Sequence, residues 1–239
     1  MYETRSKVER GFSASPTVRH SRITAELQPA QHDWPHGPAL TTHLQRHLGK
    51  TETVWHEIVS EFLHIDVHAY EPSPHWPAVV LVTEGMSRWP MMVPRELHPR
   101  WRWAELVLCL SRDWPLGQTD IKDERHFWPL RWLWKLARFP HEYRTWLGYG
   151  HTVPNGDPPH PFADNTELCC WLLAPPAIFA KGFSEVALAS GETLHLYTPI
   201  PIYGSELELK LKQGADALLR RLWDAGALAV LNPTRKPVC

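Results

Sequence analysis

The chain has 239 residues, 43% of them hydrophobic and 21% charged, which is an ordinary composition for a soluble globular protein. The 25 basic residues nearly balance the 26 acidic ones, so no basic field exists to attract nucleic acid, and no apolar run is long enough for a membrane span. Four cysteines without C-x-x-C spacing, and an N-terminus without a signal-peptide pattern, favour a cytoplasmic protein without a disulfide framework.

The first 30 residues are charged and then rich in small residues and proline, so we predict a flexible N-terminal arm over residues 1–30. One domain is expected to occupy residues 31–239, because no linker divides that stretch. Within it, a short helical pattern begins at Thr41, and Gly49 is expected to end it.

Seven later segments carry the β-branched and aromatic residues, or the continuous apolar runs, that are typical of strands. In chain order they are residues 51–60, 63–70, 78–83, 103–110, 168–173, 185–188 and 193–198. The continuously apolar segment 78–83 is expected near the centre of the sheet. The pair Ser190 and Gly191 predicts a hairpin between the last two strands.

Two long helices complete the predicted elements. Residues 123–139 have apolar positions at helical spacing, and Pro140 is expected to block any continuation. Residues 205–225 are expected to form one closing helix that tolerates Gly214 in its interior. Because strands and helices do not alternate regularly, we predict an α+β fold, a single domain with a mixed, mainly antiparallel sheet flanked by helices.

The segment 63–70 has one apolar and one polar face, since alternate side chains of a strand point in opposite directions. The apolar face is formed by Leu63, Ile65 and Val67. The polar face carries three possible metal ligands, His64, Asp66 and His68. Further ligands could come from a later loop, at His151, Asp157 and His160. A metal-dependent hydrolase is therefore one alternative, and a polar network that covers the sheet or faces water is the other.

Three residues in or near the apolar strands could carry chemistry. Glu105 interrupts an apolar strand, so it either has a partner, such as His151 or an arginine, or lies at an exposed position. Ser87 lacks the G-x-S-x-G context of a nucleophile elbow and is expected to cap a turn by hydrogen-bonding backbone. Cys109 is expected to be an inert core thiol. Because no catalytic constellation is complete, we expect neither an enzyme nor a bound metal or cofactor.

Two segments combine features of binding surfaces. Trp89 and Pro90 lie beside Met91 and Met92, which predicts an exposed apolar patch that could adapt to a partner. Residues 131–135 (RWLWK) mix cations with tryptophan and would suit an acidic peptide better than nucleic acid, given the neutral net charge. Alternatively, their tryptophans are buried and their cations solvated.

Several short motifs follow one another in a fixed order along the chain. They are HIDV at 64–67, LVTEGMS at 81–87, MM at 91–92, AELVL at 104–108, DWP at 113–115, WPL at 128–130, LARFP at 136–140, TWL at 145–147, GHT at 150–152 and PIY at 201–203, followed by Glu206 and Gly214. This ordered set resembles the suppressor of fused domain, in its bacterial form. The ordered set extends from about residue 40 to residue 231, which is most of the chain.

The resemblance implies a single α+β domain with no known catalytic residues. In animals, domains of this type bind and restrain a transcription factor by clamping its peptide, whereas bacterial relatives are thought to act as immunity proteins that neutralise toxins. The second animal domain, which completes the clamp, has no counterpart in this sequence. The animal partner is therefore not carried over.

We therefore expect a protein-binding domain, an immunity protein that neutralises a toxin by covering its active site with roughly 800 Å² of surface per partner. No nucleic acid, membrane or cofactor is expected to take part. The candidate contact residues are His64, Asp66, Met86, Ser87, Trp89, Met91, Met92, His151 and Asp157. A binder of carbohydrate or another ligand through exposed tryptophan is a third alternative.

Overall fold

The computed structural model describes residues 34–51, 53–56, 63–74, 76–97, 100–117 and 123–239, and the backbone of two short paired strands before them. Those two strands are β1 (Val8–Glu9) and β2 (Thr17–Val18). The predicted flexible arm over residues 1–30 otherwise lies outside the described residues. No helix within the described ranges has both the length and the apolar character needed to cross a membrane.

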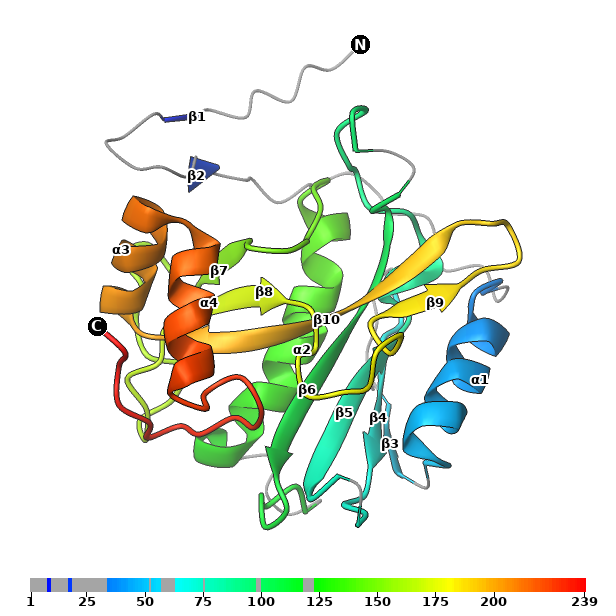
Figure 1. Ribbon diagram of the computed structural model, residues 1–239, viewed down its shortest axis with the longest axis horizontal. Coiled ribbons are helices and arrows are strands. Elements are labelled where there is room, and N and C mark those ends of the chain that lie inside the picture. Colours follow the sequence, from blue (N-terminus) through cyan, green and yellow to red (C-terminus); the bar gives the residue numbers. More distant parts are fainter. Residues whose placement is uncertain are drawn as a thin grey trace.

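One eight-stranded sheet runs through the molecule in the order β3-β4-β5-β6-β10-β8-β7, with β9 paired to β10 beside this path (Figure 1). Its strands are β3 (Thr53–Trp55), β4 (Asp66–Tyr70), β5 (Ala78–Glu84), β6 (Trp103–Ser111), β7 (Thr152–Pro154), β8 (Cys170–Ala174), β9 (Glu185–Ala187) and β10 (Thr193–Ile202). Every pairing in the described part of this sheet is antiparallel except that of β6 with β10. The predicted α+β fold with a mixed, mainly antiparallel sheet is confirmed.

Helices cover both faces of the sheet (Figure 1). They are α1 (Gly37–Leu48), α2 (Glu124–Glu142), α3 (Gly204–Gln213) and α4 (Ala215–Asp224), and a short 3-10 turn, η1 (Met86–Arg88), follows β5. The helix α2 packs on one face in the largest apolar cluster, whereas α1 and the pair α3 and α4 bury separate clusters on the other. The sheet is therefore the middle layer of three.

The alternation predicted along β4 is confirmed. Leu63, Ile65 and Val67 are completely buried in the cluster beneath α2, whereas Asp66 and His68 are only partly covered. Burying an aliphatic side chain of this size contributes about 1.5–3 kcal/mol relative to leaving it in water. The polar side chains of β4 are thus directed away from the main core by the same period of two.

The helix α2 extends past the residue at which the sequence predicted its end. It continues through Pro140 to Glu142, and the Tyr143 N–H donates to the carbonyl of Phe139 at 3.1 Å to close the last turn. A proline removes one hydrogen bond and restricts the preceding residue, but only two helical residues follow this one. The prediction that Pro140 ends the helix was therefore wrong.

The predicted closing helix over residues 205–225 is two helices, α3 and α4, and this prediction was also wrong. Gly214 separates them with φ 89° and ψ 167°, and its N–H donates to the Lys210 carbonyl at 2.8 Å. A positive φ is accessible to glycine without the steric penalty that other residues meet, so Gly214 allows the chain to turn here. The turn lets α4 bury Leu218 and Leu222 against the sheet.

The strand β10 is longer than predicted, since it continues through Pro199 and Pro201. It pairs with β6 over Leu194–Tyr197 and with β8 over Thr198–Ile202. Beyond Tyr197 one side of β10 is therefore free of strand pairing within the described sheet, and proline is tolerated at such an edge because no ladder donor is lost there.

Candidate functional site

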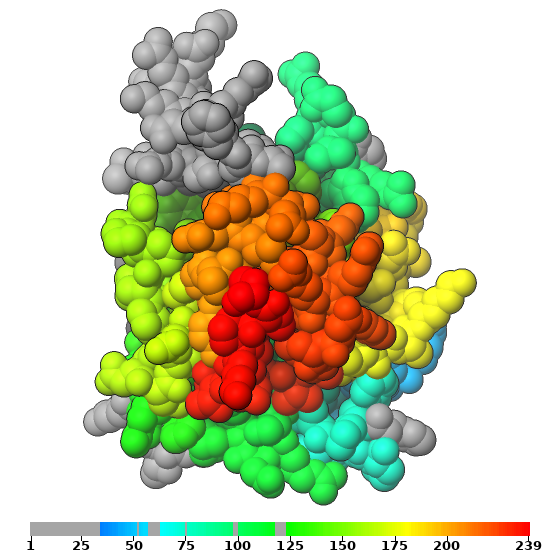
Figure 2. Space-filling view, turned by 60° about the vertical axis from the view of Figure 1, so that its left-hand side comes forward, coloured from blue at the N-terminus to red at the C-terminus, as the bar shows by residue number. Residues whose placement is uncertain are grey.

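The loop between β5 and β6, residues 85–102, lies at the end of the sheet where β4 begins, and we call it the β5–β6 loop. It starts with the turn η1 and then projects beyond the body of the molecule (Figures 1 and 2). Its root is fixed by two titratable side chains, a fully buried one from β6 and a partly buried one from α2.

The first anchor is Glu105, whose side chain is completely buried in β6. Two hydroxyl groups donate to its carboxylate, from Thr83 at 2.7 Å and from Ser87 at 2.6 Å. The backbone N–H groups of Gly85, Met86 and Ser87 donate to it at 3.0, 3.3 and 2.8 Å. A single carboxylate therefore accepts from three successive backbone N–H groups of the turn, and neither of the partners predicted for Glu105 is used.

Burial raises the pKa of Glu105 to about 7, although the hydrogen bonds from Ser87, Thr83 and Gly85 oppose that rise. The Ser87 hydroxyl is buried and donates to the Glu105 carboxylate, so it fixes the turn through a side chain and not, as predicted, by a hydrogen bond to backbone. Burial likewise raises the pKa of Cys109 to about 12, which agrees with an inert core thiol.

The turn also requires glycine at position 85. Gly85 has φ 129°, and a Cβ atom there would lie 2.3 Å from the carbonyl oxygen of His64. No side chain fits at that distance from a backbone atom, so any substitution would push β5 away from the start of β4. The root of the β5–β6 loop and the segment that carries His64 are thus in direct contact.

The second anchor is His141, near the end of α2. Its Nε2 atom lies 2.9 Å from the carbonyl oxygen of Met86, and the neutral ring donates this hydrogen bond. Burial lowers the pKa of His141 to about 4, although the hydrogen bond to Met86 opposes the fall. Trp89 packs edge-on against the same ring, with the centroids 5.9 Å apart. The turn η1 is therefore held from β6 on one side and from α2 on the other.

The next part of the loop is fixed through its backbone. The Met91 N–H donates to the Arg102 carbonyl at 2.9 Å, and the Met92 N–H donates to the Thr145 carbonyl at 3.0 Å. The sulfur of Met91 accepts a hydrogen bond from the Leu147 N–H at 3.4 Å, and its side chain is buried. Met92, in contrast, is 63% exposed. The two neighbouring methionines therefore have opposite environments.

These environments correct part of the predicted contact surface. Met86 and Ser87 are completely buried and Met91 is nearly so, because they pack or donate into the root of the loop. The expectation of an exposed patch is thus wrong for Met91 and confirmed for Met92, while Trp89 is half-buried. Contact of Trp89 and Met92 with a partner stays a prediction.

The polar side chains on and beside β4 have partners other than those predicted for His64, Asp66 and His68. His56 Nδ1 and His64 Nε2 lie 3.0 and 2.9 Å from the same oxygen, Oδ1 of Asp66. His68 instead pairs with Glu84 at 2.9 Å. Burial alone would lower the pKa of His68, but the hydrogen bond and charge of Glu84 raise it above its usual value. The predicted triad is therefore wrong in His68 and lacked His56, which comes from the neighbouring strand.

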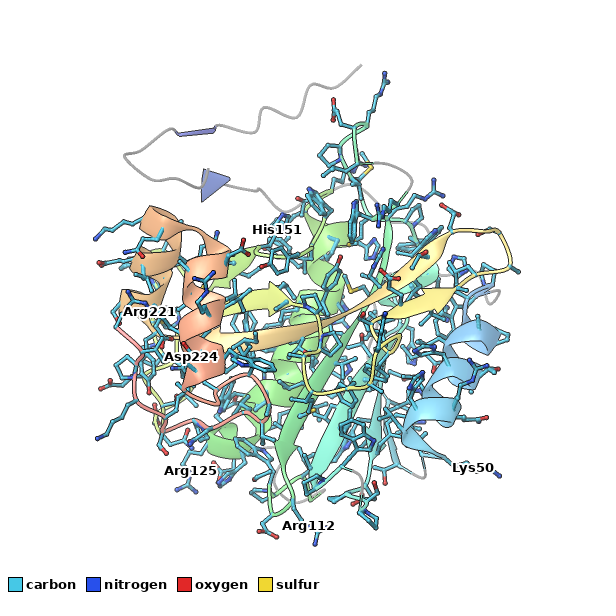
Figure 3. All side chains as sticks on the ribbon, viewed as in Figure 1. Lys50, Arg112, Arg125, His151, Arg221 and Asp224 are labelled. Carbon is cyan, nitrogen blue, oxygen red and sulfur yellow. The ribbon has the colours of Figure 1, made fainter. Side chains whose placement is uncertain are left out.

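Two other predicted site residues, His151 and Asp157, lie in different parts of the molecule. The ring of His151 packs against Trp146, with centroids 4.3 Å apart, and the neighbours of Trp146 in the chain, Thr145 and Leu147, contact the β5–β6 loop. Figure 3 labels His151, which directly precedes β7. Asp157 belongs to the loop after β7, on the side of α2. Within the described residues, His56, His64 and Asp66 form the one group of three whose ligand atoms converge, and it includes no residue of that loop.

A pocket of about 710 Å³ lies between α2 and residues 155–167. The rings of Trp132 and Phe162 line it, 5.0 Å apart, and Lys135 Nζ lies 4.7 Å from the centre of the Trp132 ring. Trp134 donates to the Ile65 carbonyl at 3.1 Å. The RWLWK tryptophans therefore pack on the protein, as the alternative interpretation held. Of the 13 tryptophans, Trp223 alone is mostly exposed, at 61%.

The fold and the site together define an α+β domain whose central sheet carries a firmly anchored loop. The family model for suppressor of fused protein (SUFU) matches residues 63–236. This match covers most of the chain, and the chain therefore belongs to the suppressor of fused family. No curated protein matches the chain in sequence.

Solved structures share this fold at low sequence identity. A SUFU homologue from Neisseria gonorrhoeae matches with a TM-score of 0.61 and 15% identity, over 87% of this chain and 98% of that one. The structure described as the Sufu–Fu complex matches with 0.60 and 14%, over 88% and 93%. Drosophila Suppressor of Fused matches with 0.60 and 14%, over 85% of this chain but only 51% of that one. The chain thus spans about half the length of the Drosophila protein.

Proposed function

We propose that this chain is a non-catalytic protein-binding domain, and that its contact surface is the end of the sheet from which the β5–β6 loop projects (Figure 2). The observation that carries the proposal is the contrast between the root and the outer part of that loop. Glu105 and His141 fix the root, whereas Met92 is 63% exposed and Leu97 38% exposed. A preformed loop loses little conformational entropy when it binds, so more of its contact energy remains as affinity.

The chemistry of this surface suits a protein partner. Met92 and Leu97 offer exposed apolar side chains, the first on a backbone hydrogen-bonded to Thr145, and methionine adapts to differently shaped partners. The half-buried Trp89 beside them is a residue type that often anchors interfaces. His64 and Asp66 adjoin the loop through the contact between His64 and Gly85, and would form a polar rim.

Family membership supports the same proposal, since the structure described as the Sufu–Fu complex has this fold and contains a protein partner. We further propose that the partner of this chain is a toxin, neutralised when the loop covers its active site over roughly 800 Å² of surface per partner. The support for this finer step is the resemblance to the bacterial form of the domain.

Two equally exposed side chains provide a matched test. Met92 is 63% exposed in the β5–β6 loop, and Trp223 is 61% exposed in α4. Tagged full-length protein would be used to capture partners in the native host, and mass spectrometry would identify them. Calorimetry with the purified partner would then compare Met92→Asp with Trp223→Asp. We expect Met92→Asp to weaken binding about tenfold or more, because it places a charge in the apolar contact, and Trp223→Asp to leave it unchanged.

The experiment tests separately whether the β5–β6 loop binds a protein and whether that protein is a toxin. Equal affinity of both variants would exclude the β5–β6 loop as the contact surface, and turnover of a small molecule without any protein partner would contradict a binding function altogether. If the captured partner is toxic in a growth assay, wild-type protein should suppress that toxicity and Met92→Asp should not. A partner without toxicity would contradict the finer step alone.

A further inference from the structure

The side chains of His56, His64 and Asp66 come together where β3 ends and β4 begins, and we propose that they form a binding site for a divalent transition metal ion, Zn²⁺. The three ligand atoms lie within 4.8 Å of one another. The inference concerns an ion held by this chain alone, so it does not depend on the identity of a protein partner.

The strand pairing explains why these residues converge. His64 and Asp66 are two positions apart at the start of β4 and therefore share a face. The antiparallel register pairs Trp55 with Val67, and one further step places His56 opposite Asp66. The same carboxylate is thus approached by one imidazole along its own strand and by another from the edge strand β3.

The distances fit zinc without a large movement. Zinc binds histidine nitrogen and carboxylate oxygen at roughly 2.0–2.2 Å in tetrahedral sites, so its ligand atoms lie roughly 3.3–3.5 Å apart. Asp66 Oδ1 is 3.0 Å from His56 Nδ1 and 2.9 Å from His64 Nε2. These two edges need to lengthen by only a few tenths of an ångström, and the third, between the two histidine nitrogens, is at most 4.8 Å long and closes by rotation of the two exposed rings.

The protonation of the rings also permits the site. Each imidazole must present an unprotonated nitrogen to the ion, so a neutral ring carries its proton on the other nitrogen, Nε2 of His56 and Nδ1 of His64. The side chain of His56 is 69% exposed and that of His64 40% exposed, so water can exchange these protons. Two imidazoles and one carboxylate favour zinc over magnesium, and three protein ligands leave the fourth position open.

His68 is the natural control, because it lies on the same face of the same strand. Its Nε2 atom is already bonded to Glu84 at 2.9 Å, so it lies outside the converging group. A site built from His64, Asp66 and His68 would require that pair to separate. The variants His56→Ala and His68→Ala therefore distinguish the two possible ligand sets.

The test is calorimetric titration of Zn²⁺ into the full chain, with any affinity tag removed and adventitious metal stripped by a chelator. We expect one ion per chain for the wild type and a loss of affinity of roughly a hundredfold or more in both His56→Ala and His64→Ala. His68→Ala, and His160→Ala in a distant loop, should bind as the wild type does, and Mg²⁺ should not compete. Circular dichroism and thermal unfolding would check that each variant is folded.

The outcomes are decisive in both directions. Absence of binding in the wild type, unchanged affinity in both His56→Ala and His64→Ala, or an equal loss in His68→Ala would overturn the site. If only one of His56→Ala and His64→Ala lost affinity for Zn²⁺, the other histidine would not be a ligand, and the proposed three-residue site would also be overturned. Replacement of Zn²⁺ by Co²⁺ adds a second readout, since its visible absorption should change in the same variants.

Discussion

Glu105 and Glu206 are both completely buried carboxylates, yet the protein satisfies them in different ways. Glu105 has neutral donors, all from residues 83–87. Glu206, in the first turn of α3, pairs with the Arg235 guanidinium through both of its oxygens and accepts N–H groups from Tyr203 at 2.9 Å and Val238 at 3.0 Å. Glu105 is therefore stabilised by neutral hydrogen-bond donors alone, whereas Glu206 is stabilised by the positive charge of Arg235 as well.

The two carboxylates therefore have different structural roles: Glu105 orders the chain close to itself, and Glu206 joins segments that are far apart in the sequence. The donors of Glu105 belong to one turn, so this carboxylate sets the shape of the β5–β6 loop where it leaves the sheet. The ion pair of Glu206 joins α3 to the C-terminal segment, which lies over α3 and α4 in Figure 2. The first is suited to shaping a surface, whereas the second ties a chain end to the core.

Removing the charged partner should have the largest effect on stability. Arg235→Leu leaves Glu206 buried with an uncompensated charge, and breaking a buried pair in this way costs about 3–5 kcal/mol. Urea unfolding at neutral pH would measure the change in the free energy of unfolding. Lys236→Leu, at the exposed neighbouring position, is the control and should change it by less than about 0.5 kcal/mol. A loss below about 1 kcal/mol in Arg235→Leu would mean that the pair adds little.

The second-largest predicted effect is the contribution of Glu105 to the pH dependence of the unfolding free energy. Its pKa is raised from 4.5 to about 7, so between these values the folded protein binds the extra proton and stability falls as the pH rises. One pKa unit corresponds to about 1.4 kcal/mol, so the decrease across the window is about 3 kcal/mol. His141, whose pKa is lowered to about 4, acts in the opposite direction as the pH rises from 4 to 6.5.

The difference between wild type and Glu105→Gln removes the contribution of His141, which both proteins share. The pKa of His68 is raised mainly by Glu84, and the smaller part of that rise that comes from the charge of Glu105 is lost together with Glu105 in the variant. Unfolding free energies measured from pH 5 to pH 8 should converge in the two proteins as the pH increases. Parallel curves would show that Glu105 keeps the same charge throughout.

Glu105→Gln itself should cost about 2 kcal/mol at pH 5.5, less than the loss of Arg235. An amide has a single oxygen acceptor, so its NH₂ group would face the N–H of Met86, which now donates to Oε2 at 3.3 Å. Glu206→Gln is the sharper comparison, because it also removes the charge that Arg235 requires and should cost more. Urea unfolding of both variants would check this order, and equal losses would remove the distinction between the two carboxylates.

The sequence alone predicted what depends on periodicity. The apolar face at Leu63 and Ile65 and the interior position of β5 both followed from residues near one another in the chain, whereas the family resemblance followed from the order of motifs along most of it. The break at Gly214 could not be predicted, because an isolated glycine inside a helical pattern is compatible both with a continuous helix and with a helix end. Only the packing of α4 on the sheet requires the positive φ there.

The candidate site was predicted less well, for a related reason. The donors to Glu105 are mostly backbone N–H groups of a turn, and every residue except proline has such a group, so the sequence does not reveal them. His56 was overlooked because its place beside Asp66 depends on the register of β3 against β4, which the sequence does not state. The burial of Met91 beside an exposed Met92 likewise depends on tertiary contacts with Thr145 and Leu147.

The smallest predicted effect tests whether the hydroxyl of Ser87 acts on Glu105 or merely fills space. Ser87→Ala removes a 2.6 Å hydrogen bond but keeps the backbone N–H that donates to the same oxygen, so the loss should be about 1 kcal/mol. The hydroxyl also opposes the rise of the Glu105 pKa, so the pH-dependent decrease in stability should end at a higher pH in this variant. Ser190→Ala, whose hydroxyl is exposed, is the control and should change neither quantity. A loss of stability without a shift along the pH axis would assign Ser87 to packing, and Glu105 would then be held by the backbone of its turn and by Thr83.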